Sequence, residues 1–508
     1  MVKHLLRALA QESAIKTSLC RKDKEKKKKK EAHLSDEPVI TYHTMEVNGK
    51  PFRFKATAGY LLLKDETHKV KTRIFFISYE KGDVKDFGKR PITFAFNGGP
   101  GAASAWVHFG AMGPKRIKLT EEGEILPPPF SFEDNEYTWL DFTDLVFVDP
   151  VGTGFSYYEK DEDPMEFYGV KEDIKWAGDF IRLYITRNKR WLSPKYMAGE
   201  SYGTYRAVGL AEYLKSHHAL DLNGIIFISS ALDYQAFDFD SGSDIPYILF
   251  LPAYTATAWY HGRLEPELQK DLYKTLKEAE EWTVNHYSVA LLKGDALPAS
   301  ERTEIIKQMA RFTALPEAYI DKCNLRVKRS YFLKQLLHDE KQVVGVYDSR
   351  LKAADINPSA EEPKTDPSMF NIYGACIATL NAYLRHDLKY ENDLPYLPIS
   401  RQVSNLWNWR SGIEGDMGYV NITDTLLEVM GYNKYFRVFF ASGYFDLCTP
   451  YYSTTYIVNH LGVPPALKDN ITVKYYEGGH MMYVHLPSRK KLFDEVKSFC
   501  LYGIDSEK

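Results

Sequence analysis

The chain has 508 residues, of which 44% are hydrophobic and 14% aromatic, and its formal net charge is -3. This length exceeds what one minimal core needs, so we expect a main domain with a sizeable insertion or a second domain. The near-neutral charge argues against a nucleic-acid partner, and no apolar run reaches the roughly 18 residues that span a bilayer. The composition predicts a soluble protein without an integral membrane segment.

Residues 1–38 differ from the rest because they are basic and highly charged, with five consecutive lysines at 26–30. Such a block cannot bury enough apolar surface to offset the entropy of ordering, so a disordered basic tail is predicted here. The segment lacks the continuous apolar stretch and small-residue cleavage site of a secretory signal. By this criterion the protein is expected in the cytoplasm.

Short strands are predicted from about residue 41 onward. The runs at 60–63 and 73–79 flank a polar turn and indicate a hairpin. Later runs are continuously apolar rather than alternating, which is typical of a mostly parallel sheet covered by helices on both faces. These later runs lie at residues 92–96, 145–148, 196–198, 225–228, 438–441 and 473–476.

A helical region interrupts this strand pattern in the middle of the chain. The α/β class is therefore predicted with a discontinuous core, whose first part is 39–232 and whose second part is 433–508. Residues 233–432 between them are predicted to be a mainly helical cap insertion, in which residues 357–367 form a loop. Its expected helices lie at 265–290, 300–312, 330–338 and 371–384.

A candidate nucleophile lies in G-E-S-Y-G at residues 199–203, which matches the pattern G-x-S-x-G. The motif follows a predicted strand and precedes a predicted helix at 205–215. That context is the one a nucleophile elbow requires, because the glycines permit the tight turn that exposes the serine. We therefore assign Ser201 as the nucleophile rather than as part of an ordinary Gly/Ser turn.

A serine hydroxyl is a weak nucleophile, so a histidine base and an orienting carboxylate are also needed. Where this motif carries the nucleophile, the acid and then the histidine follow, each after a late strand. Asp446 follows the run at 438–441, and His480 follows the run at 473–476 within a Gly-Gly-His segment. His485 is the nearest rival histidine, and we interpret it as a structural neighbour or a surface residue.

Acyl transfer also needs backbone amides that stabilise the oxyanion. One amide is expected from Tyr202, directly after the nucleophile, and another from a glycine-rich loop after an earlier strand. The segment N-G-G-P-G at 97–101 follows the strand at 92–96, and we assign its Gly99 amide as the second donor. No Gly-Lys-Ser/Thr follows, which argues against a phosphate loop.

The chain contains five cysteines, and none forms a C-x-x-C pair. Their number and scatter argue against a zinc site and against a disulfide framework, although a single bridge stays open. Buried free thiols are the preferred interpretation. The cysteines are Cys20, Cys323, Cys376, Cys448 and Cys500.

Taken together, these motifs resemble those of the serine carboxypeptidases, peptidase family S10. The matching segments occur in the family's order and lie at 97–101, 149–157, 199–203, 445–446 and 479–481. The resemblance implies an α/β-hydrolase core with a helical cap. It also implies release of C-terminal residues from peptides through an acyl-enzyme on Ser201, without metal or cofactor. Family members are usually exported, so the resemblance and the lack of a signal leave the compartment open.

The resemblance further implies a site for the carboxylate at the peptide's C terminus. In the family, the residues that match Asn97 and Glu200 bind this group, with the glutamate protonated. A neutral glutamate can donate to a carboxylate, whereas a charged one would repel it. The chain departs from the family pattern at Ala95, Ala102 and Ala111, where tryptophan, cysteine and glutamate are common. The glutamate belongs to the carboxylate network, so strict C-terminal specificity stays open.

Two other functions remain compatible with the sequence. A related serine esterase or acyltransferase would use the same acyl-enzyme and pass it to a different acceptor. A catalytically inactive binding protein would keep the fold without turnover, although every expected catalytic position is occupied by a suitable residue. The natural substrate, the side-chain preference and the oligomeric state are not determined by the sequence.

Overall fold

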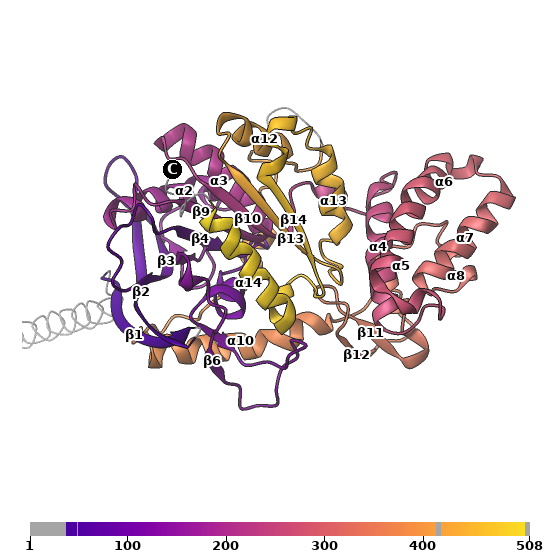
Figure 1. Ribbon diagram of the computed structural model, residues 1–508, viewed down its shortest axis with the longest axis horizontal. Helices are drawn as coiled ribbons and strands as arrows, with labels where there is room; N and C mark the ends of the chain where they lie inside the picture. Colours follow the sequence, from indigo (N-terminus) through magenta and orange to yellow (C-terminus); the bar gives the residue numbers. More distant parts are fainter. Residues whose placement is uncertain (1–36, 48, 413–417, 503–508) are drawn as a thin grey trace, which may run out of the picture.

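The computed structural model of the protein describes residues 37–47, 49–412 and 418–502, so the predicted tail at 1–38 lies almost wholly outside it. The described residues form a ten-stranded sheet (Figure 1). Its strands are β1 Val39–Val47, β2 Lys50–Lys64, β3 Val70–Lys81, β4 Ile92–Phe96, β7 Asp144–Val148, β8 Tyr157–Tyr158, β9 Lys195–Ser201, β10 Gly224–Ser230, β13 Arg437–Gly443 and β14 Ile471–Tyr476.

The strand order is β1-β2-β3-β7-β4-β9-β10-β13-β14, with β8 paired to β3. The predicted hairpin is confirmed, because β2 and β3 pair antiparallel with Leu61 opposite Ile74. From β7 to β14 every neighbouring pair is parallel, which confirms the mostly parallel sheet. Parallel strands end at the same edge of a sheet, so the segments that follow β4, β9, β13 and β14 meet there.

Both faces of the sheet are buried, as the continuous apolar runs predict. Along β10, Ile225 and Phe227 belong to one hydrophobic cluster, while Ile226 and Ile228 belong to the cluster on the opposite face. This alternation is the two-residue period of a strand, and each face needs its own helical cover.

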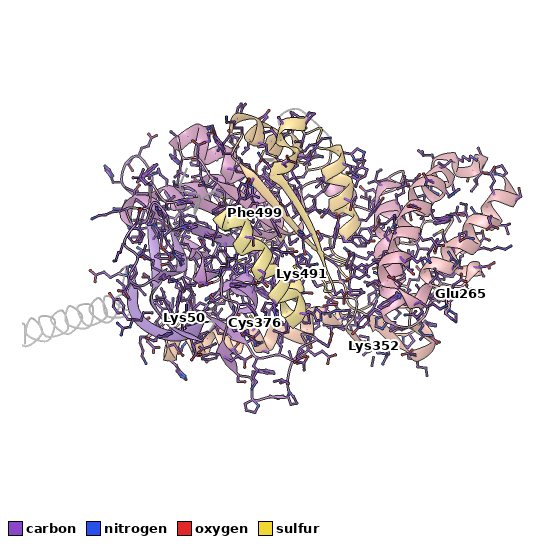
Figure 2. All side chains as sticks on the ribbon, in the orientation of Figure 1. Lys50, Glu265, Lys352, Cys376, Lys491 and Phe499 are labelled. Atoms are coloured by element: carbon purple, nitrogen blue, oxygen red, sulfur yellow. The ribbon has the colours of Figure 1, made fainter. Side chains whose placement is uncertain are left out.

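Helices from the first, middle and last parts of the chain cover these faces. Cys376 of α10 and Phe499 of α14 pack into the same cluster (both are labelled in Figure 2). Helices α2, α3, α12 and α13 contribute to the cluster on the other face. Their bounds are α2 Val170–Arg187, α3 Tyr202–His218, α10 Pro367–His386, α12 Thr423–Tyr432, α13 Tyr451–His460 and α14 Leu486–Leu501.

The region predicted as a cap contributes to three clusters. Helices α4 to α9 share a third cluster, which also includes Phe445, Leu447 and Tyr451 from the segment after β13. Helices α4 to α8 form the lobe at the right of Figure 1, whereas α10 and α12 pack on the sheet. The division of the chain into domains therefore stays a prediction. The remaining helices here are α4 Ile245–Tyr260, α5 Leu272–Trp282, α6 Ser288–Lys293, α7 Ala299–Thr313, α8 Glu317–Lys322, α9 Arg329–Gln335 and α11 Arg401–Leu406.

The predicted helix at 265–290 differs most from the structure, in its bounds and in its continuity. The helix expected at 265–290 begins at Leu272, because the Asp271 side chain accepts from the Lys274 amide and caps it there. A π-helical turn, Thr283–Tyr287, then separates α5 from α6. Small hairpins are formed by β5 Lys115–Ile117 with β6 Phe132–Asp134, and by β11 Gln342–Val344 with β12 Lys352–Ala354.

The four cysteines in the described part of the chain are free: Cys376 and Cys500 are buried, while Cys323 and Cys448 are partly buried. Cys20 lies outside the described residues. Within the described residues, no helix is both long enough and apolar enough to cross a bilayer.

A buried charge network anchors the start of β7. The Asp144 carboxylate accepts from the Lys81 amide and Arg90 Nε, each at 3.0 Å, and from Arg190 Nη1 at 2.6 Å. Both Asp144 and Arg190 are 1% exposed. Removing one partner of such a network leaves buried charge without compensation, which costs far more than losing a surface pair.

We expect Asp144→Asn to lower the free energy of unfolding by about 3–5 kcal/mol, measured by urea denaturation. The matched control is Asp321→Asn, which breaks the exposed ion pair with Arg302 and should cost less than about 1 kcal/mol. Equal losses in the two variants would contradict a special role for the buried network.

Candidate active site

Ser201 lies at the junction of β9 and α3 in a strained conformation. Its φ is 58° and its ψ is -128°, outside the regions that non-glycine residues usually adopt. The turn is closed tightly, because a Cβ on Gly199 would lie 2.2 Å from the Gly203 carbonyl oxygen. Strain of this kind persists only where surrounding packing imposes it, and here it directs the serine out of the sheet.

The glycine-rich loop after β4 packs directly against this turn. A Cβ on Gly98 would lie 2.5 Å from the Tyr202 nitrogen and 2.9 Å from Ser201 Cβ. Gly99 follows with a φ of +104° and lies in the wall of the same pocket as Ser201. The loop therefore needs glycine at both positions, and it brings its backbone to the serine, where an oxyanion would form.

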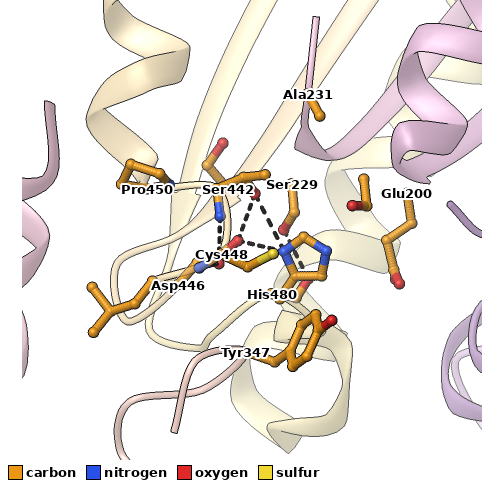
Figure 3. Close-up of polar contacts among 12 residues, drawn as sticks. Glu200, Ser229, Ala231, Tyr347, Ser442, Asp446, Cys448, Pro450 and His480 are labelled. Carbon is orange, nitrogen blue, oxygen red and sulfur yellow. Dashed lines mark hydrogen bonds and ion pairs between the residues drawn. The ribbon is translucent and has the colours of Figure 1, made fainter. Parts of the chain in front are cut away.

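Asp446 and His480 form a buried pair after β13 and β14 (Figure 3). His480 Nδ1 lies 2.7 Å from Asp446 Oδ2, and the two side chains are 3% and 0% exposed. Asp446 Oδ1 also accepts from the amides of Cys448 and Thr449, at 2.7 and 2.9 Å. These bonds fix the carboxylate, which can then orient the imidazole with Nε2 free for a proton transfer.

The backbone of His480 is held from two sides. Its amide donates to the Tyr347 carbonyl at 2.5 Å, and its carbonyl accepts from Ser229 Oγ at 2.7 Å. The Tyr347 ring also meets the imidazole edge to face, with centroids 5.4 Å apart. Tyr347 belongs to the region predicted as a cap, so that region touches the candidate base directly.

Asn97 and Glu200 are hydrogen-bonded to each other beside the serine. Asn97 Oδ1 accepts from the amides of Trp106 and Val107, at 3.1 and 3.0 Å, which directs Nδ2 toward Glu200 Oε1 at 2.8 Å. The backbone carbonyl of Asn97 is held as well, because the buried Arg206 guanidinium donates to it at 2.7 Å. The amide orientation is thus fixed by its partners.

The protonation of Glu200 and His480 is set by their burial and by each other. Burial raises the pKa of Glu200 to about 7, although His480 and the hydrogen bonds from Tyr483 and Asn97 act in the opposite direction. For His480, burial lowers the pKa, but the neighbouring Asp446 carboxylate and Glu200 outweigh it, and the net shift is upward from 6.5. Near neutral pH, Glu200 is therefore partly protonated.

Ser201, His480, Asn97, Gly99 and Glu200 all line one pocket of about 380 Å³. Its other walls are mainly apolar, and several of them come from the middle region of the chain rather than from the sheet. The other lining residues are Gly98, Pro100, Ala102, Trp106, Tyr347, Met369, Ile399, Ser404, Trp409, Cys448 and Met481.

The structure thus brings the predicted site residues together at the carboxyl edge of the sheet. Sequence reasoning missed Tyr483, whose phenol donates to Glu200 Oε2, and it also missed Tyr347 and Trp409. The one local signal in the sequence for a role of Tyr483 is that it lies three residues after His480. The other two belong to a region whose helical pattern carries no information about the site.

Comparison with known proteins places these features in a family. A family model described as serine carboxypeptidase matches residues 46–485. Serine carboxypeptidase-like 36 of Arabidopsis thaliana is 23% identical, over 84% of this chain and 74% of that protein. Serine carboxypeptidase-like 2 of the same plant is 27% identical over 45% of this chain, and the match spans about half (48%) of that relative.

A solved structure has the same fold as this chain. The prohormone-processing carboxypeptidase Kex1(delta)p of Saccharomyces cerevisiae superposes with a TM-score of 0.55 at 17% identity. The superposition covers 88% of this chain and 91% of the yeast chain, so the two share the α/β-hydrolase fold. Because the family match extends over most of its length, the chain belongs to the serine carboxypeptidase family.

Proposed function

We propose that the protein is a serine-type carboxypeptidase that removes C-terminal residues from peptides. The observation that carries this proposal is one pocket that contains both Ser201 with His480 and the hydrogen-bonded pair Asn97 and Glu200. The first pair supplies acyl-transfer chemistry, and the second supplies donors for a terminal carboxylate. The family relationship supports a peptidase in general terms.

In the proposed reaction, Ser201 Oγ attacks the carbonyl carbon of the last peptide bond while His480 Nε2 takes its proton. The resulting oxyanion is stabilised by the Gly99 and Tyr202 amides. His480 then protonates the leaving amine, the C–N bond breaks, and an acyl-enzyme forms on Ser201. Water, deprotonated by His480, hydrolyses the ester and restores the serine.

The carboxylate site explains why cleavage would be confined to the end of the peptide. A terminal carboxylate beside Asn97 can accept from its amide and from protonated Glu200. An internal peptide bond brings no such anion, so the Asn97 amide hydrogen that does not bond Glu200, and the proton of Glu200, would have no acceptor from the substrate. The distance from carboxylate to nucleophile then selects the last bond.

We expect Ser201→Ala and His480→Ala to lower kcat for a blocked dipeptide by about a millionfold, as in other serine triads. Asp446→Asn should lower kcat by about ten thousandfold, because it favours the wrong histidine tautomer. A fluorophosphonate probe should label the wild type and the control Ser216→Ala, whose serine is exposed on α3, but not Ser201→Ala. Labelling that persists without Ser201 would refute the nucleophile, and an unlabelled wild type would favour a binding protein.

The pH dependence of KM tests the carboxylate site. Glu200 is neutral below its pKa of about 7 and charged above it. A charged Glu200 repels the substrate carboxylate, so KM should be flat in acid and rise about tenfold per pH unit above roughly pH 7. His480 must be unprotonated to act as the base, so kcat should fall at acid pH.

Glu200→Gln is the matched variant, because its amide can still donate but carries no titrating proton. Its KM should stay flat where that of the wild type rises. A small ester without a carboxylate is the matched substrate, and its KM should show no rise in either protein. A wild-type KM for the dipeptide that is independent of pH would contradict the proposed role of Glu200.

The apolar pocket walls predict the side chain that is preferred at the cleaved end. Trp106, Met369, Ile399 and Met481 line the pocket and offer no charged partner to a substrate side chain. In a peptide library that is digested and analysed by mass spectrometry, C-terminal Phe, Leu and Met should be released at least about tenfold faster than Asp or Lys. Equal release of charged and apolar residues would contradict this.

A further inference from the structure

Tyr483 contacts the carboxylate site from a position that no motif covers. It lies in the short 3-10 helix Met482–Val484 and is 1% exposed. Its phenol donates to Glu200 Oε2, while Asn97 Nδ2 donates to Oε1. Each oxygen of the Glu200 carboxyl group therefore has its own donor from the protein.

The position of this phenol is imposed by its surroundings. The Tyr483 carbonyl accepts from Nε of the buried Arg489 at 2.7 Å. A Cβ on Gly110 would lie 2.8 Å from Cε2 of the Tyr483 ring, so the ring packs directly on that backbone. The ring therefore lies against the helical turn Val107–Met112, whose first amide, that of Val107, donates to Asn97 Oδ1.

We propose that Tyr483 is a positioning residue of the carboxylate site, which fixes the Glu200 carboxyl group through its phenol and stabilises the ionised form of that group. This inference rests on the proposed function, since it concerns the same site. A donor that points at a carboxylate lowers the free energy of the anion more than that of the acid. Tyr483 thus lowers the pH at which Glu200 becomes charged and begins to repel the substrate carboxylate.

The charged surroundings of Glu200 are compatible with this role. Burial raises the pKa of Tyr483 well above 10, so the phenol keeps its proton throughout the working range. Among the described residues, the ionisable groups that act on Glu200 or on the phenol come from several elements. They are His480, Asp446, Cys448 and, from α10, Cys376.

Tyr483→Phe removes only the hydroxyl, so it tests the hydrogen bond with little change in packing. Hydrogen bonds to charged groups contribute about 1.5–3 kcal/mol, which corresponds to roughly one to two pH units. We expect the rise of KM with pH to move upward by that amount for a blocked dipeptide. For a small ester without a carboxylate, KM should stay independent of pH in this variant, because the ester brings no group that Glu200 repels.

Two further variants separate this role from a structural one. In the double variant Glu200→Gln with Tyr483→Phe, no titrating carboxyl remains, so KM should be as flat as in Glu200→Gln alone. Tyr476→Phe removes another buried phenol, which donates to Glu495 outside the pocket, and it should leave the profile unchanged. An unshifted profile in Tyr483→Phe would overturn the proposal, as would an equal shift in Tyr476→Phe.

A spectroscopic titration tests Tyr483 independently of turnover. The infrared C=O stretch of protonated Glu200, assigned by its loss in Glu200→Gln, should disappear at a higher pH in Tyr483→Phe than in the wild type. If the wild type cleaves no peptide, the proposed function fails while this titration still decides the role of Tyr483. An identical titration in both proteins would refute that role even if peptides are cleaved.

Discussion

The turn between β9 and α3 holds Ser201 in a backbone conformation with φ of 58°, and glycine backbones close around it. Gly98 approaches from the loop after β4, and Gly203 packs against Gly199 and against the carbonyl of Phe96. A methyl group at any of these glycines would collide with backbone rather than with a flexible side chain. The position of the serine, and of the amides beside it, therefore depends on contacts between two neighbouring parallel strands.

The same sheet explains how residues far apart in sequence reach the serine. Asp446 follows β13 and His480 follows β14, and both strands run parallel to β9 with β10 between. Their carboxyl ends share one edge, so the loops there converge without any long connection. The middle region of the chain completes the pocket at this edge, where Tyr347 packs on His480 and Trp409 forms part of the wall.

Two titrating groups, His480 and Glu200, share this buried site and differ in the protonation state that their surroundings favour. Asp446 favours the protonated form of His480, while burial favours the neutral form of Glu200. A low-dielectric pocket strengthens both effects, because water cannot screen the charges. In the proposed mechanism, reaction needs His480 without its proton and substrate binding needs Glu200 with one. The hydrogen bonds around Glu200, including that from Tyr483, would then decide over which pH range both conditions are met.

The sequence by itself determined the α/β class, the order of the parallel strands along the chain, and the motifs around Ser201, Asp446 and His480. These are local features: apolar periodicity, and glycines wherever a turn needs them. The tertiary structure alone decided the pairing order of the strands and the contact of Tyr483 with Glu200. It also decided which residues of the middle region line the pocket. A helical pattern shows which face of a helix is apolar, but not which partner that face meets, because the partner is set by packing between segments hundreds of residues apart.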